Sequence, residues 1–64
     1  MCLSTVYVEN NGKSERVMQD VSHMVAKDDG LLLVGMFGDE KFIKGRLKSI
    51  DFQAGESVVS GYDV

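Results

Sequence analysis

The chain has no proline and no tryptophan, and only one cysteine and one histidine among its 64 residues. A single cysteine excludes a disulfide within the chain. Without a Cys-x-x-Cys pair or a Cys/His cluster, one chain also has no closed zinc site. A free thiol is typical of proteins kept in a reducing compartment.

Long apolar runs and surplus positive charge are also missing. The longest apolar run, residues 31–34, is far too short to cross a bilayer, and residues 1–5 lack the features of a signal peptide. Ten acidic and seven basic side chains give a net charge of −3, which disfavours nonspecific binding to nucleic acid. We therefore expect a cytoplasmic protein that has no membrane segment.

The length predicts one domain, spanning residues 1–64. A chain this short buries only about 60% of the surface that its unfolded form exposes, so its core is marginal. Small domains usually gain support from disulfides, metals or association. With one cysteine, association is the support we expect here.

Turn signals and apolar runs alternate along the chain. Asn-Gly and Asp-Gly pairs strongly favour tight hairpin turns, because such turns need positive φ. The turn signals lie at residues 10–12, 28–30, 38–40 and 53–55. The runs rich in strand-forming residues lie at 2–9, 15–27, 31–37, 41–52 and 57–62. About five strands joined by short hairpin turns predict an all-β fold, namely a small barrel.

Residues 15–27 allow two interpretations. Val17, Val21 and Met24 belong to a set of apolar residues at helical spacing, and Ser14 is a candidate helix cap. Alternatively, residues 15–20 are irregular or helical, and residues 21–27 form a strand that pairs with 31–37. We favour the hairpin, because a helix would leave the apolar strand 31–37 without a neighbour in sequence.

Residues 31–37 (LLLVGMF) are apolar on both alternating faces of the predicted strand. Since side chains of a strand alternate between its two faces, both faces require burial. One face can fill the barrel. The other is covered either by loops or the C-terminal tail of the same chain, or by a second copy in a homodimer.

Cys2 is the most conspicuous chemical group. Its thiolate lies close in sequence to the terminal amine and an amide nitrogen, and these donors can chelate a metal in one plane. Planar nitrogen and sulfur donors suit Ni(II) and Cu(II). Two such cysteines, brought together by a twofold axis, would supply a stronger site. The alternative is a small buried side chain, a common role of free cysteine.

Other candidate sites are weaker. His23 has no second ligand at a useful spacing, so we expect a surface position. In the run 41–48, Lys44, Arg46 and Lys48 would share one strand face with Phe42 available for base stacking, but a solvated face explains them as well. The carboxylate pairs at 28–29 and 39–40 fit turns. No catalytic motif is present, so we do not expect an enzyme.

Several short stretches resemble one family. They are MCLSTVY at residues 1–7, VMQDV at 17–21, FGDE at 37–40 and GRLKSIDF at 45–52. These stretches are similar to CooT, the small nickel-binding accessory protein of carbon monoxide dehydrogenase maturation. The resemblance implies an SH3-like barrel, a homodimer, and Ni(II) bound through Cys2. The alternative function is a small RNA- or protein-binding barrel with an incidental cysteine.

Overall fold

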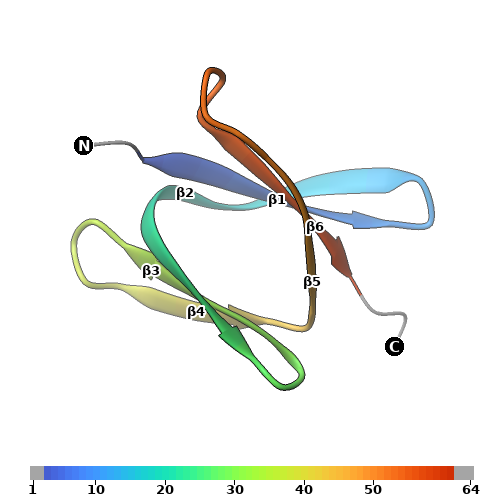
Figure 1. The fold of residues 1–64 in the computed structure, drawn as a ribbon, viewed down its shortest axis with the longest axis horizontal. Coiled ribbons are helices and arrows are strands. Elements are labelled where there is room, and N and C mark those ends of the chain that lie inside the picture. The colour runs from blue at the N-terminus through green and yellow to red at the C-terminus, as the bar shows by residue number, and fades with distance from the viewer. Residues whose placement is uncertain (1–2, 62–64) are drawn as a thin grey trace.

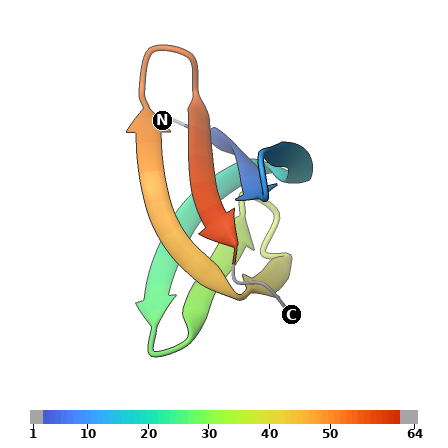
Figure 2. The ribbon, with the colours of Figure 1, turned by 90° about the vertical axis from the view of Figure 1, so that its right-hand side faces the viewer.

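The computed structural model describes residues 3–61, and these form one curled sheet of six strands (Figure 1). The strands are β1 (Ser4–Asn10), β2 (Lys13–Lys27), β3 (Gly30–Gly35), β4 (Glu40–Ile43), β5 (Gly45–Asp51) and β6 (Glu56–Gly61). Their order across the sheet is β4-β3-β2-β1-β6-β5. Only β1 and β6 run parallel; all other neighbours are antiparallel. The sheet bends into a half-barrel (Figure 2), so the all-β prediction is confirmed.

The structure has six strands where the sequence predicted about five. The predicted strand over residues 41–52 breaks at Lys44, and its two parts, β4 and β5, lie at opposite edges of the sheet. Directly after the break, Gly45 allows β5 to approach β6 closely, because a Cβ there would lie 2.6 Å from the carbonyl oxygen of Ser60. The break therefore carries the chain from one edge of the curled sheet to the other.

Residues 15–27 form strand and not helix, so the hairpin interpretation is confirmed. The far half of β2 pairs with β3 from Val21 to Lys27. Residues 15–20, expected to be irregular or helical, are also strand, which corrects that part of the prediction. Three register shifts fall in β2, and each places one extra residue in this strand. Asp20, with a φ of 56°, lies in the same region.

These bulges explain the helical spacing. The half-buried Met18, the buried Val21 and the half-buried Met24 are three residues apart. The intervals 18–21 and 21–24 each contain one bulge residue. The inward-facing positions are therefore three residues apart, whereas in a regular strand they are two residues apart. Because a bulged strand imitates the helical period over a short stretch, periodicity alone could not separate the two structures.

Five apolar residues form the buried core. They are Val6, Val21, Leu31, Leu33 and Val59. β3 contributes its inward face to this core, with Leu33 fully buried. Its outward residues Leu32 and Val34 are half-buried within the single chain. One face of β3 therefore fills the half-barrel, and the other is only partly covered by the same chain.

The first hairpin turn has the predicted geometry. Asn11 and Gly12 have φ values of 51° and 78°, the positive values that a tight turn of this kind requires. Across residues 3–61 no helix is long and apolar enough to span a membrane.

Candidate functional site at the start of the chain

Cys2, the predicted metal ligand, lies outside the described residues, which begin at Leu3. From residue 4 onward the chain start is held firmly. The Ser4 and Ser57 hydroxyl oxygens are hydrogen-bonded at 2.7 Å, and Ser57 is fully buried. The backbone N–H of Thr5 donates to the Gly55 carbonyl at 2.8 Å. The residue bonded to Cys2 therefore leads directly into an anchored strand.

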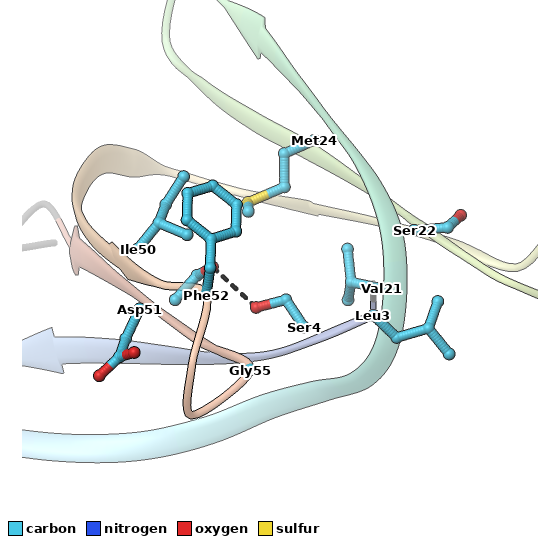
Figure 3. Close-up of a pocket in the computed structure, with 10 residues that line it drawn as sticks. Leu3, Ser4, Val21, Ser22, Met24, Ile50, Asp51, Phe52 and Gly55 are labelled. Atoms are coloured by element: carbon cyan, nitrogen blue, oxygen red, sulfur yellow. Dashed lines mark hydrogen bonds between the residues drawn. The ribbon is translucent and has the colours of Figure 1, made fainter. Parts of the chain in front are cut away.

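A hollow of about 130 Å³ lies beside this chain start (Figure 3). Its apolar lining includes Leu3, Val21, Met24, Ile50 and Phe52. Phe52 is 79% exposed and Ile50 is 41% exposed, so two large apolar side chains lie next to each other at the rim of this hollow. The chain start thus emerges next to an apolar, solvent-accessible surface.

The turn between β5 and β6 holds Phe52 at this position. The side-chain oxygen Oδ1 of Asp51 accepts hydrogen bonds from the backbone N–H groups of Gln53 at 3.0 Å and Ala54 at 2.9 Å. The N–H of Gly55 donates to the Asp51 carbonyl at 2.9 Å, and Gly55 has a φ of 71°. Such side-chain bonds to the following backbone rigidify a turn. The exposed phenylalanine therefore sits on an ordered support.

Sequence reasoning missed this hollow. The turn signal at residues 53–55 was visible, and so was the apolar content of Ile50 and Phe52. Nothing in the sequence indicated that this turn folds back against the chain start, because the contact depends on the parallel pairing of β1 with β6.

His23 is exposed and lies on β2, next to Ser22. The Ser22 hydroxyl donates to the Val34 carbonyl at 3.2 Å and lies 3.0 Å from Nδ1 of His23. The surface position agrees with the expectation from sequence.

The predicted basic face does not form as one strand face. Lys44 lies at the break between β4 and β5, so Phe42 and Arg46 belong to strands at opposite edges of the sheet. Lys48 lies at a register shift and forms an ion pair with Glu9. The structure therefore does not bring the basic residues and Phe42 together on one strand.

Of the two carboxylate pairs, Asp28, Asp29 and Asp39 lie in turns, whereas Glu40 begins β4. Residues 28–29 form the turn between β2 and β3. Asp39 closes the turn between β3 and β4, where its carbonyl accepts from the N–H of Gly35 at 2.7 Å. In the part of the chain that the structure describes, no three His, Cys, Asp or Glu residues gather as a metal site.

Comparison with known proteins identifies the family. The family model for the CO dehydrogenase accessory protein CooT matches residues 1–60. An uncharacterized protein of Methanocaldococcus jannaschii is 34% identical over 61 residues, which cover 95% of this chain and 100% of that protein. A crystal structure assigned to CooT from Carboxydothermus hydrogenoformans is similar with a TM-score of 0.87 and 26% identity, covering 97% of this chain and 100% of that chain. The chain thus belongs to the CooT family of CO dehydrogenase accessory proteins.

Proposed function

We propose that the protein binds Ni(II) through Cys2 of both chains of a homodimer. It would hold or deliver this nickel during maturation of a nickel enzyme, carbon monoxide dehydrogenase. The family match carries this proposal, because it extends over residues 1–60 and therefore includes position 2. Nickel is the cargo in this function, and the protein acts on the enzyme's metal supply as a cytoplasmic accessory protein and not as a catalyst.

The chemistry of the chain start supports the choice of metal. Cys2 offers a soft thiolate, and the amine and amide nitrogens beside it complete a planar donor set that suits Ni(II). One thiolate per chain makes a weak site, whereas two thiolates across a twofold axis share one ion. The anchored strand that begins at Ser4 would hold both cysteines at a defined place in the dimer.

A metal ion shared by the two Cys2 residues restricts where the twofold axis of the dimer can lie. Because Cys2 is bonded to Leu3, a twofold axis through the metal must pass close to the hollow that Leu3 lines. Phe52 and Ile50 supply exposed apolar surface at this place. Burying such surface contributes about 25 cal/mol per Å². We therefore place the dimer interface at the chain start, around Phe52. The outward face of β3, with the half-buried Leu32 and Val34, stays the alternative interface, and Leu33, fully buried inside one chain, is not part of it.

The finer description of the fold follows the same family relationship. We interpret the half-barrel as an SH3-like barrel, in which the bulged β2 belongs to both halves of the curled sheet. The bend at Asp20 and the break at Lys44 would form its two corners.

Equilibrium dialysis against Ni²⁺ tests the proposal. The unmutated protein should bind one nickel per two chains, with a thiolate charge-transfer absorption that Mg²⁺ does not produce. Cys2→Ser should remove this absorption and most of the affinity, while His23→Ala, the matched control, should change little. Because the ligands must lose protons, affinity should fall as the pH is lowered.

Two further measurements sharpen this test. A tag before Met1 converts the terminal amine into an amide, so weaker binding would identify the amine as a ligand. Light scattering of Phe52→Ser should show weaker association than the unmutated protein. Unchanged nickel binding in Cys2→Ser would end the metallochaperone proposal and favour a small RNA- or protein-binding barrel.

A further inference from the structure

Besides the outer edge of β4, two strand edges lack a neighbour in the described part of the chain. β5 is an edge of the sheet, with β6 as its single partner. The far half of β2 is also open on one side, because β1 pairs with β2 only as far as Val21 among the described residues. Every second residue of such an edge directs its N–H and C=O away from the sheet. Both edges therefore offer unpaired backbone groups.

A hollow of about 430 Å³ separates these two edges. Met24, Ala26 and Lys27 line it from β2, while Arg46 and Leu47 line it from β5. This hollow is distinct from the one at the chain start, although Met24 contributes to both.

Leu47 and Ala26, two apolar side chains of this hollow, face inward and are nevertheless exposed. Leu47 lies opposite Val59, which is fully buried, yet Leu47 itself is 43% exposed. Ala26 lies opposite Leu31, which is 6% exposed, yet Ala26 is exposed. In a closed sheet, residues on the same face as a buried partner are covered by the next strand. The half-barrel thus leaves the inward face of β5 and of the far half of β2 uncovered at this position.

The charges around this hollow favour an acidic occupant. Lys27, Arg46 and Asp28 line it, which gives one net positive charge in a chain whose net charge is −3. Within residues 3–61 one ion pair forms, between Lys48 and Glu9. Lys27 and Arg46 are therefore not in ion pairs within this part of the chain. Both cations therefore remain available to a partner.

We propose that this hollow binds an extended acidic segment of a partner protein, which adds as a strand along β5. The backbone of the segment would pair with the free edge of β5, and an apolar side chain would cover Leu47 and Met24. Its carboxylates would lie against Arg46 and Lys27. This mode of recognition takes its affinity from backbone hydrogen bonds and its selectivity from the pocket and the charges.

A synthetic peptide tests this proposal without a known partner. The probe is a peptide of about eight residues, alternating valine and threonine and beginning with two aspartates. It is titrated into the isotope-labelled full chain and followed by amide chemical shifts. We expect saturable shifts confined to β5 and to the far half of β2. N-methylation of alternate residues in the peptide should abolish binding, because it removes the donors that pair with the edge.

Two charge-reversal variants locate the site. Arg46→Glu should weaken peptide binding by roughly fivefold or more, since an exposed charge pair is worth a few-fold in affinity and reversal adds repulsion. Lys13→Glu, at the start of β2 in the first hairpin, makes the same charge change elsewhere and should leave binding unchanged. Both residues are exposed, so both variants should keep the fold, which the amide spectrum verifies.

Four results would overturn the proposal. The first is no binding at millimolar peptide, and the second is equal binding of the N-methylated peptide. The third is concentration-dependent shifts of Gly45, Arg46 and Leu47 in the protein alone, which would show that a second copy occupies this part of the edge, away from the dimer interface proposed around Phe52. The fourth is that a uridine oligonucleotide binds where the peptide does not, and that Arg46→Glu abolishes this oligonucleotide binding.

Discussion

Adjacent leucines of β3 should respond very differently to truncation. Leu33 is fully buried in the core, whereas Leu32 faces outward and is half-buried. Leu33→Ala removes three carbon atoms from a site without solvent, which costs about 2.4 kcal/mol at about 0.8 kcal/mol per buried methylene. The cavity left behind raises the cost to about 3 kcal/mol or more. For Leu32→Ala we expect a smaller loss of about 1–2 kcal/mol, because part of its side chain already contacts water and no closed cavity is left.

These costs are large for this domain. A free energy of unfolding of roughly 0.05–0.15 kcal/mol per residue amounts to about 3–10 kcal/mol for a chain of this length. Leu33→Ala should therefore remove a third or more of the stability. Urea unfolding followed by far-ultraviolet circular dichroism measures both variants, and repetition at two protein concentrations separates folding from association. Equal losses in both variants, or a larger loss in Leu32→Ala, would refute the assignment of the inward face of β3.

Three further substitutions test local features. Asp20→Val should destabilise the fold by about 1–2 kcal/mol, because a β-branched residue tolerates the positive φ at this position poorly. Asp20→Gly should cost little, and thermal unfolding of the two variants measures the difference. Gly45→Ala should cost about 1–3 kcal/mol, since the added Cβ meets the Ser60 carbonyl, and an unchanged melting temperature would contradict this. Ser57→Ala should cost about 1 kcal/mol and speed amide hydrogen exchange at the chain start, because Ser4 loses its buried partner.

The local pattern of the sequence determined the class of the fold. Turn residues such as Asn11 and Gly12 set the strand connections, because asparagine and glycine tolerate the positive φ values that a tight turn requires. Alternating apolar runs then predicted the strands, and the family resemblance of residues 1–60 is confirmed by comparison. The role of Cys2 as a metal ligand stays a prediction, since Cys2 lies outside the described residues.

Tertiary structure decided what depends on contacts between distant segments. The sequence around Lys44 reads as one continuous strand, and only the curl of the sheet requires the chain to leave one edge and start the other. The helical spacing in β2 arises from bulges, which exist only in relation to the registers of β1 and β3. The hollow at the chain start likewise requires the parallel pairing of β1 with β6, which brings Leu3 beside the turn that carries Phe52. Local propensity acts over a few residues, whereas these features depend on which strands become neighbours.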